Sequence, residues 1–340
     1  MTEPLTSLDE LARLAADLPG PNEAARAAAA ARQASLTKPA GALGRLEELA
    51  IWLTAWQGVE KPHLEAAQAL VFAGNHGVTA RGVSAFPSDV TKQMVANFTA
   101  GGAAINQLCA AYDIDFRLIA LDLDQPTADF CAAPAMREAE FLAAVASGMA
   151  AVDRHSDILI LGEMGIGNTT AAAAICHGLF GGAARDWVGR GTGVDDAGLA
   201  LKAAVLEEAQ ARHHDAASGP LDIARRVGGH ELAAILGAVL AARRAGIPVI
   251  LDGFVCTADA APLARQTAGA LDHCLAGHCS AEAGHRRLLD ALALPPLLDL
   301  DMRLGEGSGA AMALGVLRGA LAAHNGMATF EEAAVSEKST

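Results

Sequence analysis

The chain of 340 residues carries 25 basic and 39 acidic side chains, giving a net charge of −14, and it has no cluster of Lys or Arg. Nucleic acid is therefore excluded as an expected partner, because nothing in the chain could neutralise a run of phosphates. With 52% hydrophobic, 19% charged and 4% aromatic residues, the composition excludes a disordered protein and predicts a globular core of small aliphatic side chains.

No apolar run reaches about 18 residues without a glycine, a proline or a charge, so we expect no membrane span. Six cysteines are scattered without a Cys-x-x-Cys pair, and we find no signal peptide. We therefore expect reduced thiols and a cytoplasmic protein.

Residues 1–65 are predicted to be helical. Leucines recur at helical spacing on both sides of an alanine-rich stretch, and Pro39 with Gly41 marks a turn. The leucines are Leu8, Leu11, Leu14 and Leu18, then Leu43, Leu46, Leu49 and Leu53, around residues 24–34. We interpret this region as a helical subdomain away from the chemistry.

Short apolar runs then alternate with helical patterns. The runs are residues 69–73, 114–123, 158–161, 247–251 and 295–301. Strands that alternate with helices predict βαβ units around a parallel sheet, in which ligands bind beyond the carboxyl ends of the strands. The glycine-rich segments that follow the strands are therefore the candidate sites. Residues 310–323 predict a final packed helix.

Residues 162–170 read Gly-Glu-Met-Gly-Ile-Gly-Asn-Thr-Thr, which has the design of a phosphate loop. Gly165 and Gly167 let the backbone approach a ligand, Thr169 adds a hydroxyl, and the following helix points its positive end at an anion. The Gly-Lys-Ser/Thr of a nucleoside-triphosphate loop is missing, so a tight turn is the alternative. Glu163 either faces a developing positive charge or is a solvated turn carboxylate.

Residues 189–196 form a second glycine-rich segment, ahead of another helical pattern. Asp195 or Asp196 is suited to cap that helix, and Lys202 would lie about two turns along it. The lysine either reaches towards a phosphate or is solvated.

Residues 304–311 place a lone glutamate, Glu306, between two glycines after a predicted strand. Such an accessible carboxylate suits a general base held at the mouth of a pocket. The alternative is a turn in which Glu306 caps the next helix.

Two histidine-bearing segments support less specific predictions. His76, within residues 74–78, either bonds a substrate or orients its loop. Residues 273–285 hold three histidines and two cysteines, but their spacing matches no common zinc site. We expect a polar loop there and no metal.

Taken in chain order, these segments resemble the nicotinate-nucleotide–dimethylbenzimidazole phosphoribosyltransferase family over about residues 36–320. The most specific pair is Glu-Met-Gly-Ile-Gly-Asn-Thr-Thr with Leu-Gly-Glu-Gly-Ser-Gly. The other matching segments are residues 36–39, 43–47, 74–78, 82–87, 189–193, 252–254 and 277–285.

The resemblance implies an α/β fold, with a doubly wound, Rossmann-like parallel sheet in a large domain over residues 66–300. A small helical domain would combine residues 1–65 with the C-terminal helix of residues 301–340, which also carry the active-site glutamate loop. The resemblance also implies a homodimer, and we expect no cofactor. The implied reaction transfers the 5-phosphoribosyl group from nicotinate mononucleotide to 5,6-dimethylbenzimidazole, giving α-ribazole 5′-phosphate and nicotinate for the nucleotide loop of cobalamin.

The resemblance further implies roles for individual residues. Glu306 matches the catalytic base, and Glu163 lies near the ribose. The expected phosphate and nucleotide contacts are Gly165, Gly167, Asn168, Thr169, Gly191 and Lys202. The expected contacts of the aromatic base are Ser84, Gln93 and Leu304.

The donor's nicotinate is a pyridinium and leaves as a neutral ring, so its departure requires neither an acid nor a metal. The weaker point is the nucleophile, and we expect Glu306 to accept the proton that the benzimidazole loses. Asn75 departs from the family pattern, because we expect Asp more often before His-Gly-Val. If that carboxylate mattered for base binding or loop order, Asn75 should alter it.

Three alternatives remain open from the sequence. The first is a related transferase that uses another aromatic acceptor, such as adenine or a phenol. The second is a non-catalytic nucleotide-binding or sensor protein with the same fold. The third is a metallohydrolase built on residues 273–285.

Overall fold

The computed structural model describes residues 5–336, which form a parallel sheet of six strands covered by helices. The strands are β1 (Ala67–Ala73), β2 (Ile114–Ala120), β3 (Ile158–Met164), β4 (Val249–Leu251), β5 (Cys274–His278) and β6 (Pro296–Leu298). Their order in the sheet is β2-β1-β3-β4-β5-β6, so the chain runs outwards in both directions from β1 and β3. This doubly wound α/β topology confirms the predicted fold class.

The described residues also form thirteen α-helices and two short 3-10 helices, which precede, connect and follow the strands. The first seven α-helices are α1 (Leu8–Ala16), α2 (Glu23–Ser35), α3 (Arg45–Gln57), α4 (Asp89–Thr99), α5 (Ala104–Ala111), α6 (Glu138–Ala151) and α7 (Asn168–Phe180). The others are α8 (Asp196–His213), α9 (Pro220–Val227), α10 (His230–Ala245), α11 (Phe254–Gln266), α12 (Ala283–Leu292) and α13 (Ser308–Gly326), with η1 (Gly77–Arg81) and η2 (Ala184–Asp186). Within residues 5–336, no helix combines the length and apolar character needed to cross a membrane.

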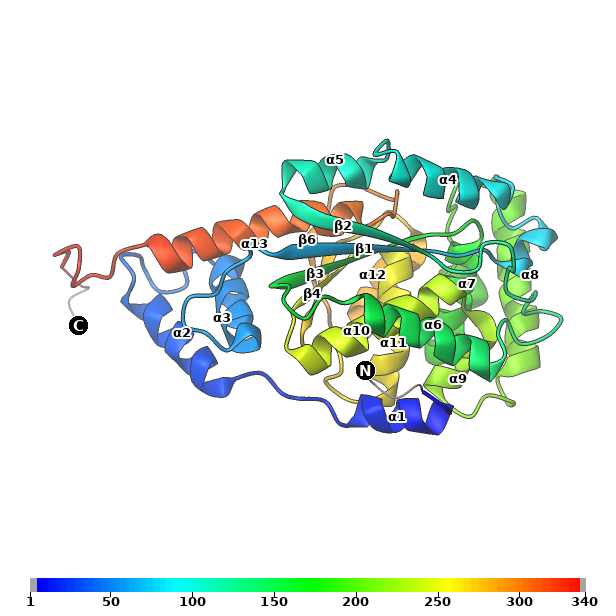
Figure 1. The fold of residues 1–340 in the computed structure, drawn as a ribbon, viewed down its shortest axis with the longest axis horizontal. Helices are drawn as coiled ribbons and strands as arrows, with labels where there is room; N and C mark the ends of the chain where they lie inside the picture. The colour runs from blue at the N-terminus through cyan, green and yellow to red at the C-terminus, as the bar shows by residue number, and fades with distance from the viewer. Residues whose placement is uncertain (1–4, 337–340) are drawn as a thin grey trace.

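The sheet is buried on both faces, as its apolar strands predict. In β1, Leu70 and Phe72 belong to the core formed with α6 and α10, whereas Ala69 and Val71 belong to the core formed with α3, α5 and α13. Figure 1 shows α4 and α5 on one side of the sheet and α6 and α10 on the other. Because the order reverses between β1 and β3, the loops after these strands flank the expected ligand crevice.

Helices α2 and α3, from the first part of the chain, meet the last helix, α13, beside the sheet. Helix α3 packs against α2 and against α13, and Leu36 forms an antiparallel bridge with Thr329. Arg32 strengthens this junction by donating from Nε to the carbonyl of His324 at 2.8 Å. Helix α1 lies apart from this group, against α9 and α11, after an extended connection (Figure 1).

The expectation of a polar loop throughout residues 273–285 is wrong. Residues 274–278 form β5, which pairs in parallel with β4 and β6. The strand contains Gly277 and His278, so its sequence lacks the continuous apolar run that marks β1, β3 and β4.

Helices α6 and α10 approach so closely that each presents a glycine to the other's backbone. A Cβ on Gly237 would lie 2.0 Å from the carbonyl oxygen of Val145, and one on Gly148 would lie 1.8 Å from that of Ala234. We expect Gly237→Ala to destabilise the protein by about 1–3 kcal/mol, because overpacking outweighs the better helix propensity of alanine. Chemical denaturation measures this change.

The matched control is Gly319→Ala in the interior of α13, where an added Cβ meets nothing within 4 Å. This variant should be neutral or more stable by up to about 1 kcal/mol. Equal stability of the two variants would contradict the packing argument.

Candidate active site

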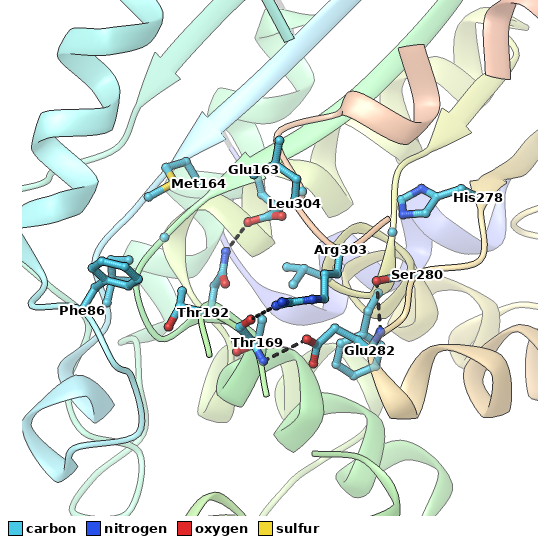
Figure 2. A pocket seen from close by; sticks show the side chains of 18 residues that line it. Phe86, Glu163, Met164, Thr169, Thr192, His278, Ser280, Glu282, Arg303 and Leu304 are labelled. Atoms are coloured by element: carbon cyan, nitrogen blue, oxygen red, sulfur yellow. Dashed lines mark hydrogen bonds between the residues drawn. The ribbon is translucent and has the colours of Figure 1, made fainter. Parts of the chain in front are cut away.

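A cavity of about 300 Å³ opens at the carboxyl edge of the sheet, as the topology predicts. Its walls come from the ends of β3, β4 and β5, the start of α7 and α11, and the turn before α13 (Figure 2). The lining residues are Phe86, Glu163, Met164, Gly165, Ile166, Asn168, Thr169, Gly191, Thr192, Gly253, Phe254, Val255, His278, Ser280, Glu282, Arg303, Leu304 and Gly305.

The cavity brings together six of the residues singled out from the sequence. Those that line it are Glu163, Gly165, Asn168, Thr169, Gly191 and Leu304. The other five are outside the lining and are Ser84, Gln93, Gly167, Lys202 and Glu306. The second set lies on segments that adjoin the lining residues, for example Gly167 beside Asn168 and Glu306 beside Gly305.

The glycines of the predicted phosphate loop are required by the protein's own packing. A Cβ on Gly165 would lie 2.5 Å from Oε1 of Glu231, and one on Gly167 would lie 2.7 Å from Thr79. Gly167 also has a φ of 95° where it caps α7, a conformation that favours glycine. The loop thus brings the amino end of α7, with its positive dipole, to the cavity.

Lys202 is only 2% exposed and is not a solvated lysine. Asp195 caps α8 by accepting from the Gly198 amide at 2.9 Å, which confirms the predicted start of that helix. Lys202 then reaches from α8 so that Nζ donates to Thr169 Oγ1 at 3.2 Å and to the Gly189 carbonyl at 3.0 Å. Burial lowers the pKa of Lys202, and the charge of Glu282 opposes that change.

Glu163 is 8% exposed and lies within β3, so it is not a solvated turn carboxylate. Its Oε2 accepts a hydrogen bond from the Asn168 side chain (Figure 2). Burial raises the pKa of Glu163 to about 8, with further upward contributions from Asp252, Glu231 and Glu306. The free protein therefore holds Glu163 protonated at neutral pH.

Glu306 is 5% exposed and lies behind the cavity wall rather than at its mouth. Its backbone adopts a left-handed φ of 64°, which turns the chain so that its carbonyl packs against Gly162 of β3. Its Oε2 has no hydrogen-bond partner in the described part of the chain. Burial, then the charge of Asp252, raises the pKa of Glu306, while a bond from the Ile105 amide lowers it.

Arg303 does not pair with Glu306, although it lies three residues before it. Its Nη1 donates to the Gly191 carbonyl at 3.1 Å, across the cavity (Figure 2). Glu306 thus has no contact with Arg303 that would lower the pKa of its carboxyl group.

The expected base-binding residues are spread over two segments. Ser84 Oγ lies 3.2 Å from Thr192 Oγ1 and accepts from the Phe86 amide, so its loop closes over the cavity. Phe86 is 51% exposed and Leu304 is 58% exposed, which gives the cavity two apolar side chains. Gln93 lies on the exposed face of α4, outside the lining.

Three further residues line the cavity but were not predicted as site residues, namely His278, Ser280 and Glu282. The signal that could have found them is the end of β5, because side chains after a parallel strand converge on the ligand edge. Glu282 Oε1 accepts from the Gly191 amide at 2.9 Å and so ties this segment to the second glycine-rich loop.

His285 supports this wall as a neutral ring. Its Nδ1 accepts from the Ser280 amide at 2.8 Å, which leaves Nε2 to donate to Thr257 Oγ1 at 3.1 Å. Burial, assisted by His278 and Arg286, lowers the pKa of His285 to about 3. Among residues 5–336, no group of three or more His, Cys, Asp or Glu side chains could hold a metal ion.

His76 and Asn75 lie outside the cavity lining and order the loops around it. His76 Nε2 pairs with Glu231 Oε1 at 2.5 Å directly beneath Gly165. The amide of Asn75 donates to the Leu123 carbonyl at 2.8 Å, a bond that an aspartate carboxylate could not make. Asn75 therefore stabilises the conformation of its loop and does not line the cavity.

Known proteins match the chain along nearly its whole length. A family model described as phosphoribosyltransferase matches residues 18–335. The nicotinate-nucleotide–dimethylbenzimidazole phosphoribosyltransferase of Mesorhizobium japonicum is 60% identical over 335 residues, covering 98% of this chain and 100% of the relative. The protein of the same name from a Ruegeria species is 59% identical over 337 residues, covering 99% and 100%. The crystal structure of CobT from Thermus thermophilus has a TM-score of 0.87 and 45% identity, covering 93% of this chain and 100% of that chain.

The proton on Glu163 gives a testable pH dependence of stability. Because its pKa rises from 4.5 to about 8 on folding, its contribution to stability is fully present below about pH 4.5 and is lost as the pH rises through 8. Glu163→Gln lacks this titration. We expect the Tm of the wild type to fall relative to that of the variant as the pH rises, with the difference levelling off above about pH 8.

Thermal unfolding of both proteins between pH 5 and pH 9 measures this difference. A gap in Tm that stays constant across the range would show that Glu163 is ionised in the free protein.

Proposed function

The chain belongs to the nicotinate-nucleotide–dimethylbenzimidazole phosphoribosyltransferase family, and we propose that the cavity at the carboxyl edge of its sheet is the site of the family's reaction. The enzyme transfers the 5-phosphoribosyl group from nicotinate mononucleotide to 5,6-dimethylbenzimidazole, giving α-ribazole 5′-phosphate and nicotinate for the cobalamin nucleotide loop. The observation that carries the site assignment is Glu306, a buried carboxylate with an unpartnered oxygen directly behind the cavity wall at Gly305.

The donor's phosphate lies at the start of α7 in this proposal. The amino end of that helix attracts an anion, and Gly165, Asn168 and Thr169 face the cavity there. Lys202 supplies a buried positive charge through Thr169, and Gly191 lies on the opposite wall. Binding of the phosphate holds C1′ of the ribose in line for attack. The binding energy of this distant group thereby raises the rate of the reaction at C1′.

Glu163 faces the positive charge of the donor. The pyridinium ring of nicotinate mononucleotide, and the ribose cation that develops as the ring leaves, both favour the ionised form of a neighbouring carboxyl group. Donor binding therefore releases the proton that Glu163 holds in the free protein. The carboxylate then stabilises the charge that spreads over the ribose, and nicotinate departs as a neutral ring.

Glu306 acts as the general base. One benzimidazole nitrogen attacks C1′ from the face opposite the leaving ring, which converts the β-linked donor into an α-linked product. The other nitrogen gives its proton to Glu306, whose raised pKa makes it a better acceptor than an ordinary glutamate. Since Glu306 lies behind Gly305, acceptor binding has to open the wall formed by residues 303–305.

The acceptor base packs against apolar side chains at the cavity mouth. Phe86 and Leu304 provide the aromatic and aliphatic surfaces, and Ser84 and Gln93 lie on the segments that approach them. Neither aromatic packing nor these polar groups select one flat base strongly, so the acceptor preference is decided by the fit of the two methyl groups.

We also propose the finer features that the family resemblance implied. These are a homodimer, a cytoplasmic location, and a small helical domain made from both ends of the chain. The packing of α2 and α3 with α13 supports that small domain, and α1 is then assigned to the large domain because it packs on α9 and α11. The exposure of Phe86 and Leu304 supports an assembly in which a second subunit covers the cavity mouth.

The direct test is product analysis by mass spectrometry with purified protein, nicotinate mononucleotide and dimethylbenzimidazole. We expect α-ribazole 5′-phosphate and free nicotinate from the wild type. Glu306→Gln should lose about 10²–10⁴-fold in turnover while keeping its fold, because general-base help is typically of that size. Near-normal turnover in this variant would overturn the assignment of Glu306.

Lys202 provides a second test, of donor binding. We expect Lys202→Met to raise the KM for nicotinate mononucleotide about ten- to a hundredfold, with a smaller change in kcat, because a charged hydrogen bond is lost from both the ground state and the transition state. The control is Lys61→Met, an exposed lysine beyond the opposite end of β1. An unchanged KM in the Lys202 variant would show that the donor's phosphate does not bind near Lys202.

A further inference from the structure

Asp252 lies under the turn that carries Glu306. It follows β4 directly and is fully buried. Its Oδ2 accepts from the Gly307 amide at 3.0 Å, and its Oδ1 accepts from the Ala310 amide at 2.9 Å. The carboxyl group thus bonds the residue immediately after Glu306 and the first turn of α13 at the same time.

This turn needs external support. Gly305, Glu306 and Gly307 have successive φ values of 83°, 64° and 83°, and the middle residue is not a glycine. A non-glycine residue in the left-handed region persists only where the surrounding structure holds it. Gly162 packs against one side of the turn, and the two bonds from Asp252 hold it from the end of β4.

His278 occupies the space on the far side of Asp252. Its Nδ1 lies 3.5 Å from Asp252 Oδ1, and both ring nitrogens lack a hydrogen-bond partner within residues 5–336. Glycines make room for the ring, since a Cβ on Gly309 would lie 1.9 Å from Nδ1 and one on Gly253 would lie 3.1 Å from Cε1. The ring therefore lies beside Asp252, in a space that the absence of side chains on Gly309 and Gly253 leaves open.

We infer that Asp252 is a positioning residue for Glu306: its two oxygens hold the turn in place, and its negative charge lies beside the reacting carboxylate. This inference rests on the proposed role of Glu306 as the base. Asp252 touches no substrate in this account and acts through Glu306. Its two amide bonds use different oxygens, which favours the carboxylate form despite burial.

The pKa of Glu306 depends on the charged groups around it. Burial raises the pKa of Glu306 first, and Asp252 raises it further. Glu163 faces Glu306 from β3, and Arg303 turns away to the Gly191 carbonyl. For Asp252 itself, burial raises the pKa, while His278 and the amides of the turn lower it. Removing the charge of Asp252 should therefore lower the pKa of both Glu306 and Glu163.

The test is the pH dependence of kcat/KM for the variant Asp252→Asn. This change keeps the size of the side chain, removes its charge and turns one acceptor into an amide that faces an N–H. We expect turnover to fall about ten- to a hundredfold, since small displacements of a catalytic group have effects of that size. We also expect the acid limb of the profile to move to lower pH, which a loss of structure alone would not produce.

Asp259→Asn is the matched control. Asp259 is a second buried carboxyl group, on α11, and neither of its oxygens has a partner in the described residues. Burial raises its pKa well above the ordinary value, which favours the neutral form, and Asp259 makes no hydrogen bond to the turn that carries Glu306. This variant should keep the acid limb of the wild type.

The outcomes separate this inference from the proposed function. An Asp252→Asn enzyme with normal turnover and an unmoved acid limb would overturn the role of Asp252, while loss of turnover in Glu306→Gln would leave the base assignment intact. Normal turnover in Glu306→Gln would instead overturn the proposed base. If Asp252→Asn does not fold, the profile of Glu163→Gln decides, because this variant lacks the titration of Glu163. An acid limb of this variant at or below the pKa of an ordinary glutamate contradicts a negative charge beside Glu306.

Discussion

Four carboxyl groups are buried together at one edge of the sheet, and the proposed reaction depends on the total charge that they carry. Glu163, Asp252, Glu231 and Glu306 are all buried, and none forms an ion pair with Lys or Arg in the described part of the chain. Burying negative charge is unfavourable, and burial raises the pKa values of Glu163, Asp252 and Glu306. A ligand group with a positive charge favours the ionised form of such carboxyl groups, and the pyridinium ring of the proposed donor is such a group.

The fold creates this crowding through the reversal of strand order. Because β1 and β3 lead outwards in opposite directions, the loops after them leave a crevice between them, and the ends of β4 and β5 complete it. Glycines then let the layers close. Gly165 leaves room for Glu231 beneath the phosphate loop, and Gly162 leaves room for the turn that carries Glu306. Glycines at these two positions therefore allow the carboxyl groups to lie close to one another.

Much of this arrangement could be predicted from residues that are close in sequence. The strand-to-helix turn of residues 162–170, the cap at Asp195 and the general α/β pattern depend on local glycines, local capping and apolar periodicity. The surroundings of each carboxyl group could not be predicted in this way. Glu306 was expected at the pocket mouth because glycines flank it, but those glycines serve a left-handed turn that packs it inwards. Likewise, Asp252 and His278 meet only because β4 and β5 are neighbours, and the glycine and histidine residues of β5 hid it among the polar segments.

In the proposed mechanism, Glu163 in the acidic site holds a proton that is displaced when the cationic donor binds. Isothermal titration calorimetry at pH 7, in buffers of different ionisation enthalpy, counts the protons released when nicotinate mononucleotide binds. With the pKa of Glu163 at about 8 in the free protein, we expect release of most of one proton by the wild type and little by Glu163→Gln. Binding without proton release by the wild type would contradict the account, because the carboxyl cluster would then already be ionised before its cation arrives.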